Sequence, residues 1–272
     1  MLRLLGIFHK RETLTRAMQD DDLRSASESI RRISGVSTPM STPPSDALFN
    51  ILHLENYEDS GPLNELHRPT DLGDIYERVG GRKYILILPP CDIMVRTKGG
   101  YRGSDSDLIK EGILAEIVDA LPKGGLAWKL DYFLNRQSMF VDFKKAFSAK
   151  LLYLDLCVFN SDGSAKFKIQ DPPAKLLIPA WMKRHQAVAK HLGKIVESYQ
   201  YINPTGPQKD RINKLLTQAD SESNLVGTIN PDEGSIAMNF KRVARLLTPR
   251  STALLKAYGE FLNRDAFDHS FI

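Results

Sequence analysis

The sequence has only two cysteines, Cys91 and Cys157, among its 272 residues. Two cysteines cannot form a disulfide framework, and alone they cannot supply the four ligands of a structural zinc site. Both lie in apolar stretches that are typical of strands. We therefore expect two buried, reduced thiols in a cytoplasmic protein, and we expect Cys91 to be chemically unreactive.

Long hydrophobic runs are also missing. No apolar stretch approaches the roughly 20 residues needed to cross a bilayer. Residues 1–11 contain a short apolar patch that lacks the length and the small-residue cleavage site of a secretory signal. The composition, with 42% hydrophobic and 26% charged residues, is typical of a globular protein, so we expect no membrane partner.

Cofactor and metal motifs are absent too. The sequence has no Walker loop, no dinucleotide-binding glycine fingerprint and no paired Cys-x-x-Cys motif. His185 and His191 are six residues apart, so on a helix they point in different directions and do not form a metal-binding pair. We predict no cofactor and no metal site, and we expect His185 to be a hydrogen-bonded core residue.

Charge is unevenly distributed along the chain, whose formal net charge is +4. Residues 1–82 hold 10 Lys and Arg against 13 Asp and Glu, a balance of −3, whereas residues 173–272 hold 14 against 9, a balance of +5. A basic C-terminal third is compatible with nucleic acid, with an acidic partner, or with ordinary solvated helix faces.

The patterning divides the chain into three regions. Residues 1–44 read as a helical arm that ends in a Ser/Thr/Pro-rich linker, residues 45–171 as a β-rich, barrel-like domain, and residues 172–272 as mainly helical. The predicted fold class is α+β. We expect a curved antiparallel sheet or small SH3-like β-barrel in the middle and a helical C-terminal part.

Local signals predict the individual elements. We expect strands on either side of the turn at Gly80-Gly81 and at residues 132–134, 139–143, 151–159, 165–169, 225–229 and 236–240. Helices are expected at residues 12–34, 179–199 and 208–218, from Ser45, and from Thr248-Pro249. Residues 107–121 fit a helix or a strand equally well, because their β-branched content competes with a helical spacing.

A first candidate site combines Cys91 and Asp92 at the end of a strand that is apolar on both faces. A thiolate there could act as a nucleophile with His67 or His53 as its base. The alternative is a buried cysteine and an aspartate that caps the turn after the double proline. No hydrolase signature surrounds these residues.

A second candidate site consists of Asp131, Asp142 and Lys144. A carboxylate on one strand and Asp-x-Lys on the next occur in metal-dependent nucleases, where carboxylates hold magnesium and lysine positions the attacking water. A solvated strand face would explain the same residues.

A third candidate is a basic and aromatic loop, Arg96, Tyr101 and Arg102, which could bind nucleic acid by stacking on a base. An ordinary surface loop has the same composition. A continuous basic groove beside Asp92 and these two arginines would support the nucleic-acid interpretation.

The helix predicted at residues 179–199 has an apolar stripe. Its members follow steps of three and four residues: Trp181, His185, Val188, Leu192, Ile195 and Tyr199. Such a stripe packs along one face. We expect it to contact the sheet, or a second copy of the same helix in a self-associated protein.

Two family resemblances come from short motifs. Gly-Asp-Ile-Tyr at residues 73–76, followed by Arg82 and the apolar strand through residue 89, resembles the opening of the small-barrel toxin endoribonucleases of plasmid-maintenance systems. This resemblance covers about twenty residues, 73–92, and implies a ribonuclease barrel.

A broader pattern adds Leu66-His67, Pro90-Cys91-Asp92 and the ending at residues 264–269 to the same Gly-Asp motif. It resembles a bacterial output module found beside atypical response-receiver domains, often in phage-defence neighbourhoods, and would span residues 45–272. The resemblance implies a non-catalytic regulatory or interaction module with a protein partner. The alternative is a nucleic-acid-binding barrel with nuclease activity.

Overall fold

The structure is a computed structural model that describes residues 45–101, 110–122, 127–133, 138–222 and 224–269. The chain divides into two units, Met1–Leu48 and Phe49–Ile272, and the strands found among the described residues lie in the second. The predicted helix at residues 12–34 and the linker at 37–44 lie outside the described residues. Among the helices that are described, none has both the length and the hydrophobicity that a membrane span requires.

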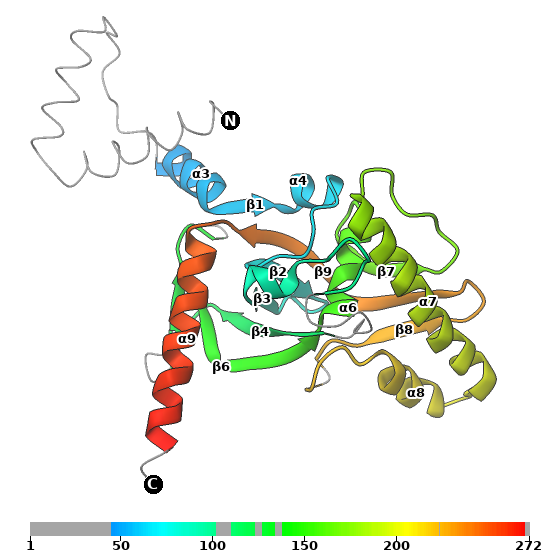
Figure 1. Cartoon of the computed structure of the whole chain (residues 1–272). Coiled ribbons are helices and arrows are strands. Elements are labelled where there is room, and N and C mark those ends of the chain that lie inside the picture. Colours follow the sequence, from blue (N-terminus) through cyan, green and yellow to red (C-terminus); the bar gives the residue numbers. More distant parts are fainter. Residues whose placement is uncertain (1–44, 102–109, 123–126, 134–137, 223, 270–272) are drawn as a thin grey trace, which may run out of the picture. The chain divides into compact units, whose positions relative to one another are not determined.

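Within these residues, nine strands form one antiparallel sheet that curls strongly into a half-barrel (Figure 1). The predicted α+β fold with a curved antiparallel sheet is confirmed. The strands follow the order β1-β9-β2-β3-β4-β6-β5, and β7 and β8 also pair with β9. Their bounds are β1 (Tyr57–Asp59), β2 (Asp74–Arg78), β3 (Lys83–Ile87), β4 (Glu111–Val118), β5 (Ala127–Leu130), β6 (Met139–Lys150), β7 (Ser164–Lys168), β8 (Gly227–Asn230) and β9 (Ser235–Leu246).

Strand β9 joins the two parts of the sheet. It pairs with β7 and β8 through residues 235–241 and with β1 and β2 through residues 240–246. The register with β2 shifts where Ile75 lies opposite Ala244 and Tyr76 opposite Arg242, which leaves one extra residue on β9. Sequence patterning predicts a boundary between regions after residue 171. Strand β9 follows that boundary in sequence and pairs with β1, β2 and β7, which precede it.

Helices precede, interrupt and follow these strands. They are α3 (Ser45–Asn56), α4 (Ser60–Glu65), α5 (Pro90–Ile93), α6 (Leu151–Leu154), the 3-10 helix η1 (Asp155–Phe159), α7 (Pro179–Ile202), α8 (Gln208–Thr217) and α9 (Arg250–His269). The predicted helices that begin near Ser45, Pro179, Gln208 and Pro249 are confirmed.

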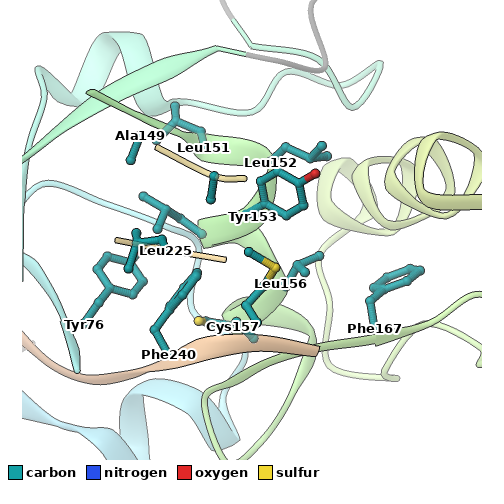
Figure 2. Packing of buried hydrophobic residues seen from close by; sticks show 14 of the residues in the cluster. Tyr76, Ala149, Leu151, Leu152, Tyr153, Leu156, Cys157, Phe167, Leu225 and Phe240 are labelled. Carbon is teal, nitrogen blue, oxygen red and sulfur yellow. The ribbon is translucent and has the colours of Figure 1, made fainter. Parts of the chain in front are cut away.

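The sheet separates two hydrophobic cores, and β3 contributes to both. Tyr84 and Leu86 join the core that includes α6, η1 and α7, whereas Ile85 and Ile87 join the core that includes α9. Figure 2 shows the first core, with the strand residues Tyr76 and Phe240 facing side chains of α6 and η1. The expectation that β3 is apolar on both faces is confirmed.

Three local expectations need correction or completion. Residues 151–159 form α6 and η1 and not a strand; because residues 151–158 are all buried, they show no periodicity that could distinguish a buried strand from a buried helix. The strand expected at 132–134 is wrong at Tyr132 and Phe133, which lie after the end of β5, and Tyr132 has a positive φ of 61°; Leu134 lies outside the described residues. The ambiguous segment contains strand β4.

The apolar stripe of α7 packs on the chain's own sheet. Val188, Leu192 and Tyr199 are buried in the first core together with Phe167 of β7 and Ile229 of β8. Burial against the sheet was one of the two predicted outcomes. Self-association through α7 would therefore have to use side chains other than this stripe.

Candidate functional site

The Gly-Asp motif at residues 73–76 is the centre of a buried charge network. Asp74 is fully buried on β2. Its Oδ1 accepts a hydrogen bond from Nε of Arg245 at 2.5 Å, and its Oδ2 lies 3.3 Å from Nη1 of Arg242. Both arginines come from β9. Two guanidinium groups compensate for the loss of carboxylate hydration, so Asp74 joins β2 to β9.

The same network reaches α4. Arg242 is fully buried and donates from Nε to Oδ1 of Asn64 at 2.8 Å and from Nη1 to the carbonyl of Arg68 at 2.9 Å. Gly73 has φ +88°, and a Cβ there would lie 2.5 Å from the backbone oxygen of Leu246. Both residues of the Gly-Asp pair therefore have a structural role in this chain.

A second buried network surrounds Asp155, the first residue of η1. Its Oδ2 accepts hydrogen bonds from Nε of Arg184 at 2.9 Å and from the hydroxyl of Tyr101 at 2.5 Å. Its Oδ1 accepts one from Thr70 at 2.8 Å. Burial raises the pKa of Asp155, and the neighbouring guanidinium of Arg184 opposes that rise. The network fixes α7 against η1.

Tyr101 was expected in an exposed loop that stacks on bases, and this expectation is wrong. Its side chain is buried, and its ring lies 4.5 Å below the guanidinium carbon of Arg184. Burial raises the pKa of Tyr101 well above its usual value, and the charge of Asp155 adds to this effect. Arg102 lies outside the described residues, so the basic groove that would include it is not part of the described surface.

The two cysteines lie in different environments. Cys157 is buried in η1, as expected, and burial raises the pKa of its thiol to about 12. Cys91 is exposed, which corrects the expectation of burial. Strand β3 ends at Ile87, and the following prolines begin the one-turn helix α5, so Cys91 leaves the sheet and reaches the surface.

The histidines proposed as bases for Cys91 have other partners. Nδ1 of His67 donates to the carbonyl of Val158 at 2.7 Å. The ring of His53 lies 2.8 Å from the carbonyl of Tyr132 and 3.0 Å from a carboxylate oxygen of Asp59. Each imidazole therefore connects neighbouring segments. Asp92 lies 3.5 Å from Nζ of Lys110.

The proposed nuclease carboxylates do not converge. Asp142 lies opposite Ala127 at the start of β5, whereas Asp131 follows the last residue of that strand. Four residues of strand separate these positions by about 13 Å. Asp131 is partly buried, which opposes ionisation, but hydrogen bonds from Arg250 and Lys129 lower its pKa. Within the described part of the chain, no three metal-ligating side chains are grouped around one point.

Lys144 and the two histidines of α7 complete the predicted set. Lys144 is exposed, and its backbone N–H donates to Asp142 at 3.1 Å. His185 is buried with its ring 4.9 Å from that of Phe159 and 4.8 Å from that of Phe167, which confirms its place in the core. Burial lowers its pKa, and it lowers that of His191 as well.

One surface brings two distant segments together, and we call it the α5–α7 patch. Val95 packs against the cluster of Leu177 and Trp181, and a Cβ on Gly99 would lie 2.8 Å from the backbone of Lys183. Residues 94–99 and the start of α7 are therefore in direct contact. The exposed side chains of the patch are Met94, Arg96, Lys175, Leu176, Ile178, Met182 and Lys183.

A shallow groove of about 480 Å³ lies on the other side of the sheet, between β5 and α9. Trp128, Phe143 and Phe261 form its aromatic lining, and Glu260 and Arg264 contribute charge. Arg250 lies beside it, with its guanidinium carbon 5.3 Å from the centre of the Trp128 ring.

Comparison of the chain with protein-family models, with curated proteins and with solved structures gave no match. Its function therefore has to be inferred from its own residues. Sequence reasoning missed Arg184, Arg242 and Arg245, the cations of the two buried networks. Their carboxylate partners are 29, 168 and 171 residues away along the chain, and no local pattern indicates such a pairing.

Proposed function

We propose that this protein is a non-catalytic regulatory or interaction module that acts in bacterial signalling or phage defence. One observation carries the proposal: two buried carboxylates and one of the candidate histidine bases hold the fold together. Asp74 and Asp155 are buried in arginine networks, and His67 is bonded to η1. The resemblance to a bacterial output module adds support.

The alternative is a nucleic-acid-directed barrel with nuclease activity. Magnesium-dependent hydrolysis requires carboxylates that share an ion. Asp142 of β6 lies opposite the first residue of β5, whereas Asp131 follows the last residue of β5, and Tyr101 is inside the protein. Gly73 and Asp74, which open the stretch that resembles the toxin ribonucleases, have a structural role in this chain. These observations favour an interaction function over hydrolysis.

An activity assay tests the non-catalytic part of the proposal. The full chain would be incubated with single- and double-stranded RNA and DNA in the presence of Mg²⁺ or Mn²⁺, beside Asp142→Asn. We expect no cleavage, or a trace that the variant retains and that comes from a contaminant. Cleavage that disappears in Asp142→Asn, with an unchanged circular dichroism spectrum, would overturn the proposal.

A pull-down from a bacterial host tests the interaction part. We expect a protein to be retained by the full chain at stoichiometric amounts, and to stay bound after nuclease treatment. Loss of every retained protein on nuclease treatment would instead support the nucleic-acid alternative, because binding through nucleic acid depends on the intact polymer.

A further inference from the structure

We infer that the α5–α7 patch binds an acidic segment of a partner protein that carries apolar anchor side chains. This inference rests on the proposed interaction function and names the chemistry of its partner. It is carried by three properties of the patch: its exposed apolar side chains, its charge and its rigid support.

The apolar side chains are large and exposed. The exposed fractions are 63% for Met94, 62% for Leu176, 54% for Ile178 and 36% for Met182. Each is next in sequence to a residue that packs in the small core of Val95, Leu177 and Trp181. Ile178 and Met182 are one helical turn apart, and the N–H of Met182 donates to the carbonyl of Ile178, so they share a face. Exposed apolar side chains grouped in this way are typical of protein interfaces, and methionine adapts to different partners.

The charge of the same two segments has one sign. Residues 93–101 and 172–183 contain four basic residues, Arg96, Lys98, Lys175 and Lys183, and no Asp or Glu. Three of them, Arg96, Lys175 and Lys183, are the exposed basic members of the patch. The acidic residues that directly precede the two segments are Asp92, which pairs with Lys110, and Asp171, whereas Asp105 and Asp107, which follow the first segment, lie outside the described residues. A partner that covers the patch has to be acidic to complement this charge.

The support beneath the patch is rigid. The Asp155 network fixes Arg184 of α7 and Tyr101 at the end of the first segment to the same carboxylate. Prolines at 172, 173 and 179 restrict the backbone of the second segment. A surface held in one conformation loses little entropy when a partner binds.

The composition favours a protein partner over nucleic acid or a membrane. Its apolar members are aliphatic or methionine, whereas surfaces that bind single-stranded nucleic acid use aromatic side chains as stacking platforms. Membrane-surface helices present one long apolar face. In α7 that face is already buried against the sheet.

Peptide selection tests the inference. The full chain would be immobilised and used to select from a displayed library of random 16-residue peptides, with no host protein present. We expect enriched peptides that combine Asp and Glu with Leu, Ile or Phe. A selected peptide would then be titrated against the wild type, Lys183→Glu and the matched control Lys194→Glu, which changes the same charge on an exposed position of the same helix. We expect Kd to rise at least tenfold for Lys183→Glu and less than twofold for the control.

A second variant tests whether the exposed apolar side chains of the patch contribute to binding. Two other ligands, an RNA and lipid vesicles, test whether the partner is a protein. Ile178→Ser with Met182→Ser should also raise Kd at least tenfold, whereas Leu215→Ser, an exposed leucine on α8, should not. An unenriched or basic peptide pool, or equal effects of Lys183→Glu and its control, would overturn the inference. So would tighter, Lys183-dependent binding to a 20-nucleotide RNA or to phosphatidylcholine vesicles with one-fifth phosphatidylserine. A host partner whose binding is unaffected by these variants would leave the interaction function standing and remove only this patch.

Discussion

Arg184 and Asp155 form an ion pair in which neither side chain is exposed, with Nε and Nη2 of Arg184 both 2.9 Å from Oδ2 of Asp155. The pair joins α7 to η1 across 29 residues of sequence. A buried pair of this kind contributes little compared with a well-packed apolar pair, but losing one partner leaves the other charge buried and uncompensated.

We therefore expect Asp155→Ala to lower the free energy of unfolding by about 3–5 kcal/mol in urea melts. The double variant Asp155→Leu with Arg184→Met should recover much of this loss, because it removes both charges. Lys256→Ala is the control: its partner Glu260 is a solvated surface neighbour, and the expected change is within about 0.5 kcal/mol. If Asp155→Ala and Lys256→Ala have equal effects, the buried network is assigned wrongly.

His185 should make stability depend on pH. Burial lowers its pKa, although the charge of Asp171 opposes the shift. The unfolded chain therefore binds a proton at higher pH than the folded chain does. The contribution of the neutral His185 side chain to stability is fully present above the unfolded pKa of about 6.5. It is lost as the pH falls through the lower pKa of the folded state. We expect urea melts to show decreasing stability between about pH 7 and pH 5, and a smaller decrease in His185→Phe. An identical slope in that variant would contradict the assignment.

The stripe of α7 gives a third prediction. Leu192 is fully buried in the first core, whereas Lys194 is exposed two residues later. We expect Leu192→Ala to cost roughly 2–5 kcal/mol of stability and Lys194→Ala less than about 0.5 kcal/mol. Light scattering on both variants would show whether the stripe also affects self-association. Equal urea midpoints would mean that the buried face of the helix is wrong.

We expect the thiol of Cys91 to react with an alkylating reagent before the thiol of Cys157 does. Cys91 is exposed, whereas Cys157 is buried with a pKa raised to about 12, and the thiolate is the reactive form. We expect iodoacetamide at neutral pH to add one label, at Cys91, to the folded protein and a second only in urea. Mass spectrometry of tryptic peptides would locate both labels, and Cys91→Ser should give an unlabelled folded protein. Labelling of Cys157 first would contradict its burial.

Part of this fold follows from sequence alone. The continuous apolar run that predicts β3, a strand buried on both faces, and the three- and four-residue spacing that predicts α7 both reflect burial along one element, which is a local property. The same is true of the strands on either side of Gly80-Gly81, where both glycines have positive φ in the turn. Such patterns depend only on which face of an element meets the core, so they are readable before the partner elements are known.

Tertiary structure decided the rest. Residues 151–158 are all buried, so their sequence has no alternation of apolar and polar residues that would distinguish a helix from a strand. In the structure they pack in the first core as helices and not as a strand. Cys91 is exposed, against expectation, because the chain leaves the sheet after Pro89. Tyr101 is buried, also against expectation, because the chain returns to the core, where the tyrosine hydroxyl donates to Asp155. The Gly-Asp motif that contains Asp74 resembles that of the toxin ribonucleases in sequence. In the curled sheet, Arg242 and Arg245 of β9 lie against Asp74 and give it a structural role. Charge pairing between residues far apart in sequence is determined by the path of the backbone, and no local pattern contains that path.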